Sequence, residues 1–172
     1  QLLADHCTFL EEIYLEREPR FVRGITETLR ASGKAEGFIT ENGLYELVSS
    51  TTNSLRVLKV DFACDRNLSF AKLPDRLNVW LEELSMADVP KLDDAFLANL
   101  ANKCRFLRTV RVTKCNVGNK GVQALAELCS DLELVFLEGA RPSPGTIDEL
   151  WKKCPHLEYV SFDSPVTRVI YY

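Results

Sequence analysis

The chain has 172 residues, of which 46% are hydrophobic and 27% charged, and its formal net charge is −4. This length suits a single domain or a solenoid with a continuous core. The acidic balance argues against a nucleic-acid partner, because phosphate binding needs clustered Lys and Arg, and no run of eighteen apolar residues predicts a membrane span. Since a helical pattern is already under way at Gln1, we expect residues 1–172 to be a single repeat domain from a longer chain.

Six segments along the chain share one pattern, in which a leucine is followed by apolar residues three and five positions later. The slot three positions before the leucine holds cysteine in four segments, and Thr52 or Asn78 in the other two. The anchoring leucines are Leu10, Leu55, Leu81, Leu107, Leu132 and Leu157, at intervals of 45, 26, 26, 25 and 25 residues. These near-equal intervals predict a structural repeat.

Each repeat also has a helical half. Apolar residues at helical spacing occur in residues 39–50, 92–104, 121–129 and 146–154, with Asp93, Asn119 and Thr146 as N-caps or first-turn residues. A short strand follows each helix, and Leu107, Val110 and Val112 are expected to point inward. One strand and one helix per 25 or 26 residues predicts an α/β solenoid of about six units with a parallel concave sheet.

The pattern resembles the cysteine-containing leucine-rich repeats of the F-box/LRR family, most closely at residues 39–44 and 117–122. The resemblance implies a protein-recognition module, the substrate-binding part of an SCF-type ubiquitin ligase receptor. Skp-type adaptor and cullin subunits would then associate through an F-box outside this chain. Two alternatives stay open: a leucine-rich-repeat scaffold or assembly adaptor unrelated to ubiquitin, and a small-ligand or hormone co-receptor of the same architecture.

A cysteine occupies the same position in four of the six repeats, and this regularity distinguishes a packing role from a chemical one. Cys104, Cys129 and Cys154 stand 25 residues apart, and Cys7 fills the same slot in the first unit. Free cysteine behaves as a small hydrophobe, whereas zinc usually requires CxxC pairs or nearby histidines. We therefore predict a ladder of packed, reduced thiols with no metal or cofactor, which places the protein in the cytoplasm or nucleus.

Two segments depart from the regular pattern. The long first interval contains an insertion, residues 17–38, which is either an irregular loop or a binding element for an acidic peptide or phosphate. Its basic side chains are Arg17, Arg20, Arg23, Arg30 and Lys34. The Leu73-Pro74 pair resembles the start of an F-box, but the repeat resumes at Leu81, so we assign the pair to a short connection within the third unit.

The candidate site is the concave face, where alternate strand residues should meet solvent. Its predicted partner-binding residues are Tyr14, Lys59, Arg111, Leu134, Phe136 and Tyr159. Leu134, Phe136 and Tyr159 form an apolar cluster beside Arg111, unless neighbouring loops cover it. No GxSxG, HExxH or P-loop motif occurs, so we predict that the protein is not an enzyme.

Overall fold

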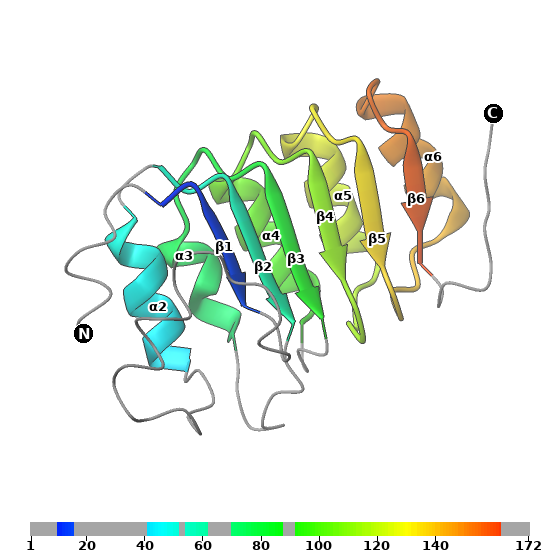
Figure 1. The fold of residues 1–172 in the computed structure, drawn as a ribbon. Coiled ribbons are helices and arrows are strands. Elements are labelled where there is room, and N and C mark those ends of the chain that lie inside the picture. Colours follow the sequence, from blue (N-terminus) through cyan, green and yellow to red (C-terminus); the bar gives the residue numbers. More distant parts are fainter. Residues whose placement is uncertain (1–9, 16–40, 52–53, 62–69, 88–91, 163–172) are drawn as a thin grey trace.

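Six short strands form one sheet in the computed structural model, which describes residues 10–15, 41–51, 54–61, 70–87 and 92–162. The strands are β1 (Glu12–Leu15), β2 (Val57–Asp61), β3 (Glu83–Ala87), β4 (Thr109–Val112), β5 (Leu134–Leu137) and β6 (Tyr159–Ser161). They lie side by side in chain order, and every neighbouring pair is parallel (Figure 1). This arrangement confirms the predicted α/β solenoid.

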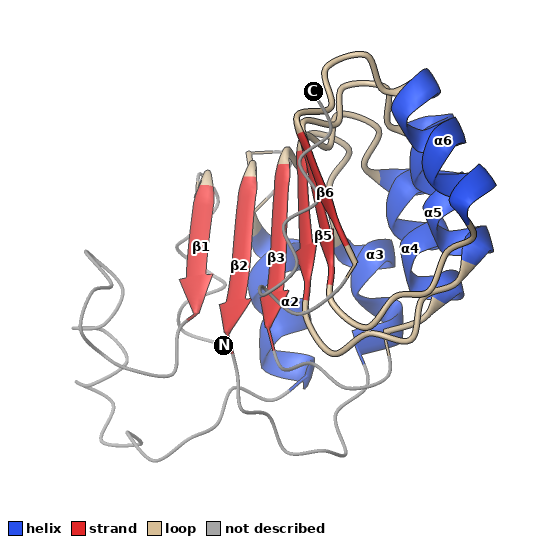
Figure 2. Ribbon diagram, turned by 90° about the vertical axis from the view of Figure 1, so that its right-hand side faces the viewer, coloured by secondary structure: helices blue, strands red, loops and turns tan. Residues whose placement is uncertain are grey.

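The helices of the described residues form a second layer on one face of this sheet (Figure 2). They are α2 (Glu41–Ser50), the 3-10 turn η1 (Phe70–Lys72), α3 (Leu73–Arg76), α4 (Asp94–Lys103), α5 (Asn119–Leu128) and α6 (Pro144–Lys153). No helix of the described ranges covers the other face of the sheet. We call this the open face, and it corresponds to the face predicted to be concave.

The core lies between the two layers and follows the strand period. Ile13, Leu58, Leu84, Val110 and Val135 are aligned across five strands and are fully buried. Two residues further along, a second buried row is made by Val60, Met86, Val112 and Leu137. Since successive side chains of a strand point to opposite faces, the residues between these rows must lie on the open face. The five anchoring leucines from Leu55 onward are also buried.

Polar side chains at the starts of α4 and α5 join these two repeats to the repeat that follows each. Asp93 is the N-cap of α4 and accepts a hydrogen bond from the Phe96 amide at 3.0 Å, as predicted for a capping residue. Asp94 reaches across to α5, where its carboxylate accepts from the amides of Gly118 and Gly121 at 2.8 and 2.9 Å.

Asn119 has the same role one repeat later. Its side-chain oxygen accepts from the Ser143 amide at 2.6 Å and from the Thr146 hydroxyl at 3.2 Å. Asn119 and Thr146 thus lie in the first turns of their helices, as expected, and help to satisfy the free donors of helix N-termini.

The third unit has a short helical half where a connection was predicted. Residues 70–76 form η1 and α3, and Leu73 and Pro74 are buried in the core. Proline is tolerated there because the first turn of a helix needs no amide donor from it. The Leu-Pro pair is therefore part of the repeat and does not begin an F-box, although the segment is helical rather than a simple connection.

Several expectations fall outside the described residues. These are the insertion at 17–38, with Arg17, Arg20, Arg23, Arg30 and Lys34, and Cys7, the first cysteine of the predicted thiol ladder.

Candidate binding surfaces on the sheet and its rim

The open face carries two parallel rows of side chains. Strand register aligns Glu12, Val57, Glu83, Thr109, Leu134 and Tyr159 in one row, and Tyr14, Lys59, Ser85, Arg111, Phe136 and Ser161 in the other. All six sequence-predicted site residues stand in these rows. Because adjacent strands are about 4.8 Å apart, neighbours in a row can contact one another.

Side chains of β1, β2 and β3 form a polar cluster at the N-terminal end of the sheet. Lys59 places its Nζ 2.8 Å from Oε1 of Glu83 and 5.3 Å from the ring centre of Tyr14. Burial raises the pKa of the Tyr14 hydroxyl, and its hydrogen bond with Glu12 acts in the same direction. The lysine is thus held between a carboxylate and an aromatic face, which fixes a long side chain on the surface.

A second cluster lies on β4 to β6. The guanidinium carbon of Arg111 lies 5.6 Å from the ring centre of Phe136. Arg111 is exposed and Leu134 and Tyr159 are half-buried, but Phe136 is only 9% exposed. Strand register places these four residues on neighbouring strands of the open face, but the Phe136 ring is largely covered.

The rim where the strands begin holds a further surface that sequence reasoning missed. Trp80 and Phe106 occupy the position just before the anchoring leucine in consecutive repeats. Their rings stack with centroids 4.9 Å apart and planes 10° apart, although the two residues are 43% and 44% exposed. The signal in the sequence was the recurrence of an aromatic residue at one repeat position.

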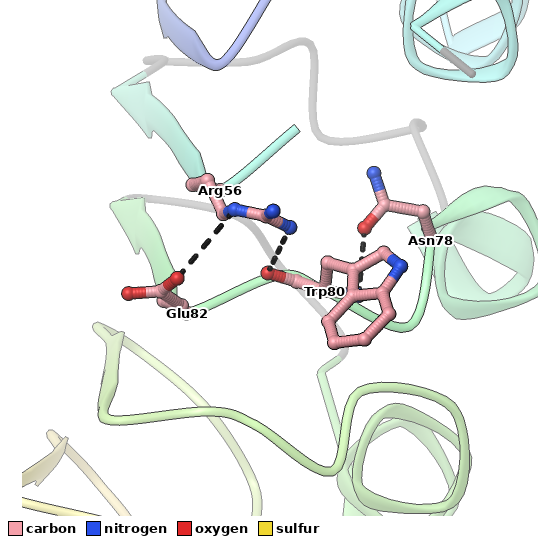
Figure 3. Close-up of polar contacts among 4 residues, drawn as sticks. All are labelled: Arg56, Asn78, Trp80 and Glu82. Atoms are coloured by element: carbon pink, nitrogen blue, oxygen red, sulfur yellow. Dashed lines mark hydrogen bonds and ion pairs between the residues drawn. The ribbon is translucent and has the colours of Figure 1, made fainter. Parts of the chain in front are cut away.

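Arg56 fixes the Trp80 end of this stack. Its guanidinium carbon lies 5.5 Å from the Trp80 ring centre, and its Nη1 donates to the Trp80 carbonyl oxygen at 3.3 Å. Its Nε is 3.6 Å from Oε1 of Glu82 (Figure 3). On the other side, the Trp80 amide donates to Oδ1 of Asn78 at 2.9 Å (Figure 3). Arg56 and Asn78 therefore fix the Trp80 backbone, while the exposed indole contacts the Arg56 guanidinium and the Phe106 ring.

A groove with a volume of about 560 Å³ runs along this rim. Its lining residues are Arg56, Trp80, Glu82, Phe106, Arg108, Asp131, Glu133 and His156. Arg108 donates from Nε to Oε1 of Glu133 at 2.9 Å, and this hydrogen bond raises the pKa of the guanidinium. The groove thus combines an aromatic wall with internally paired charges.

The described cysteines pack in the core, as predicted. Cys104, Cys115, Cys129 and Cys154 are free and buried, and the thiols of the three ladder cysteines donate to backbone carbonyls of the preceding repeat. Burial raises the pKa of Cys104 and Cys129 to about 12 and that of Cys154 to about 11. Within the described ranges, no group of three or more potential metal ligands occurs.

These features define the class of protein: the chain folds as a leucine-rich-repeat solenoid. Residues 103–126, which contain β4 and most of α5, match the family model described as Leucine Rich repeat. Such repeats generally serve in protein recognition, so the match supports a protein-interaction module in general terms. None of the helices in the described part of the chain has the length and apolar character needed to cross a bilayer.

Proposed function

We propose that this domain binds a protein partner on the open face of its sheet. The observation that supports the proposal is the second open-face cluster, in which an exposed Arg111 lies over an aromatic ring beside half-buried Leu134 and Tyr159. Arginine and aromatic residues supply most of the binding energy in protein interfaces, with hot spots worth about 2 kcal/mol or more.

The rigid strands support the same proposal. The backbone of a hydrogen-bonded strand is already ordered, unlike that of a loop, so less of the interaction energy is lost to ordering the chain on binding. The Lys59 cluster adds a charged region to the same face, where its lysine already lies against Glu83 and Tyr14. A partner that spans the face would meet a polar cluster on β1 to β3 and, on β4 to β6, an apolar cluster beside Arg111.

In its more specific form, the proposal makes the domain the substrate-binding part of an SCF-type ubiquitin ligase receptor. The cysteine-type repeat supports this assignment, because that pattern carries the resemblance to the F-box/LRR family. Skp-type adaptor and cullin subunits would bind a segment outside residues 1–172, and the arginines of the 17–38 insertion would extend the substrate site. The free thiols support a reducing compartment, the cytoplasm or nucleus.

The test is quantitative affinity purification of the intact protein with and without Arg111→Glu. We expect this change to lower recovery of the substrate partner by about tenfold or more, since it reverses a hot-spot charge. Skp-type and cullin subunits should be recovered equally with both forms. Lys120→Glu, at an exposed position of α5, makes a similar change of charge away from the sheet and should have no effect.

The outcomes separate the alternatives. Equal recovery of every partner by the Arg111→Glu and Lys120→Glu variants would contradict the open-face site. Loss of a specific partner without any Skp-type or cullin subunit in either sample would favour the scaffold function and reject the ligase assignment.

A further inference from the structure

The residues just before the anchoring leucines form a ladder along the rim of the sheet. From the third unit onward they are Trp80, Phe106, Asp131 and His156. Three of these side chains are planar rings, and the first two are already stacked at 4.9 Å. The ladder is interrupted by a short carboxylate at Asp131. We call the space bounded by Phe106, Asp131 and His156 the rim notch, and all three residues line the groove described above.

The dimensions of the rim notch suit one planar group. Strands repeat at about 4.8 Å, so Phe106 and His156 stand roughly 10 Å apart along the ladder. A planar group inserted at the level of Asp131 would continue the spacing of the Trp80–Phe106 stack, with one ring on each side. The Asp131 carboxylate would then lie at its edge.

The charges of the groove select a cation. Of its two arginines, Arg56 is paired with Glu82 and Arg108 with Glu133. Asp131 accepts a hydrogen bond from the neutral Ser130 hydroxyl at 3.3 Å and acts electrostatically on Arg108, whose guanidinium is already bonded to Glu133. With two cations and three carboxylates in the lining, the groove disfavours phosphate and favours a positively charged guest.

We propose that the rim notch binds an arginine side chain of a protein partner. The guanidinium group is planar, always charged, stacks on aromatic faces and pairs with carboxylates through two parallel hydrogen bonds. A lysine ammonium can meet the charge but cannot fill the stacking position. This site is separate from the open-face clusters, so it does not depend on the function proposed above.

The test is an NMR titration of the purified chain with the pentapeptide Gly-Gly-Arg-Gly-Gly. We expect saturable shifts of the Phe106 and His156 ring signals, with a dissociation constant on the order of 1 mM for this single-residue probe. The matching peptide with citrulline keeps the shape but lacks the charge, and its affinity should be lower by at least about fivefold. The lysine peptide should also bind more weakly, because it lacks the stacking plane.

Two variants locate the site. Asp131→Asn and Phe106→Ala should each weaken binding of the arginine peptide by about fivefold, and both positions are exposed, so folding should persist. Glu127→Gln removes one carboxylate from α5 in the same repeat, outside the groove, and should leave binding unchanged. Arg111→Glu should also leave it unchanged, which separates this site from the open face.

The proposal is overturned by any of three results: no saturation up to about 20 mM peptide, equal binding of the arginine and citrulline or lysine peptides, or equal binding by the Asp131→Asn and Glu127→Gln variants.

Discussion

The thiol of Cys129 donates a hydrogen bond to the backbone carbonyl oxygen of Cys104, 3.5 Å away. Cys154 makes the same contact with the Cys129 carbonyl at 3.4 Å, and Cys104 with the Asn78 carbonyl at 3.3 Å. Carbonyl groups at helix C-termini have no partner within the helix. Each thiol therefore satisfies a carbonyl near the end of the preceding helix and connects consecutive repeats through the core.

Removing one thiol should weaken the solenoid. Cys129→Ala deletes a buried sulfur atom and leaves the Cys104 carbonyl without this donor, so we expect a loss of about 1–2 kcal/mol in the free energy of unfolding. Urea denaturation, monitored by circular dichroism, measures this loss of stability. Ser130→Ala, at the exposed neighbouring position, should change stability by less than about 0.5 kcal/mol. Equal effects of the two substitutions would show that the thiol ladder contributes nothing.

The same thiols should make stability fall at alkaline pH. Burial is the main cause that raises the pKa of Cys104 and Cys129 from 9.0 to about 12 and that of Cys154 to about 11. Above pH 9 these thiols stay protonated in the folded state, whereas in the unfolded chain they lose their protons. Stability is thus fully present below pH 9 and decreases as the pH rises toward the folded values, by at most about 1.4 kcal/mol per pH unit for each thiol.

Urea midpoints measured between pH 8 and pH 10.5 test this dependence. Because lysines and tyrosines also titrate in this range, the informative quantity is the difference between the wild-type chain and Cys129→Ala. The wild type should lose stability more steeply above pH 9, since it has one more thiol to deprotonate on unfolding. Parallel curves for the two proteins would contradict the assignment.

The repeat was readable from sequence because its core obeys two simple periods. Leu107, Val110 and Val112 follow the strand period, and the leucine and cysteine slots return every 25 or 26 residues, so burial could be assigned one unit at a time. The open-face rows followed from the same alternation. These features depend on local pattern, which a single sequence contains.

The rim and the covering of Phe136 depend instead on neighbours in space. Trp80 and Phe106 are 26 residues apart, and their stacking becomes visible only when repeats are laid side by side. Solvent exposure of Phe136 depends on what lies over the ring, including Arg111 from the preceding strand. The helical turn at residues 70–76 was missed because it is too short to show a helical period.

Alanine substitutions at two glycines, in the first turns of successive helices, should have opposite effects on the stability of the protein. A Cβ on Gly121 would lie 2.8 Å from Oδ1 of Asp94 and 3.2 Å from its Cα. Gly121→Ala should therefore disrupt the hydrogen bond between the Asp94 carboxylate and the Gly121 amide, despite the better helix propensity of alanine. We expect a loss of about 2 kcal/mol in the free energy of unfolding.

Gly145 in α6 is the matched control, because a Cβ there meets nothing within 4 Å. Gly145→Ala should stabilise the protein by about 0.5 kcal/mol through helix propensity and a less flexible unfolded chain. Thermal or urea unfolding of the two variants gives the comparison. If both substitutions stabilise the protein, Asp94 does not constrain the start of α5 as its contacts indicate.

Asn78 occupies the cysteine slot of its repeat and does not fit it well. Its Oδ1 accepts from the Trp80 amide at 2.9 Å, but in the described part of the chain its buried Nδ2 has no hydrogen-bond partner. An unsatisfied buried donor costs about 1–3 kcal/mol. Asn78→Cys removes this donor, while the exposed Trp80 amide can turn to water, so we expect the variant to gain about 1 kcal/mol in unfolding free energy.

The control for this substitution is Asn102→Cys, at an exposed position of α4 where no buried amide is removed. Urea denaturation under reducing conditions should show stabilisation for Asn78→Cys alone. A variant at position 78 that is less stable than the one at position 102 would mean that the Asn78–Trp80 hydrogen bond outweighs the buried donor. The asparagine would then serve to fix the backbone of Trp80, whose indole lines the rim groove.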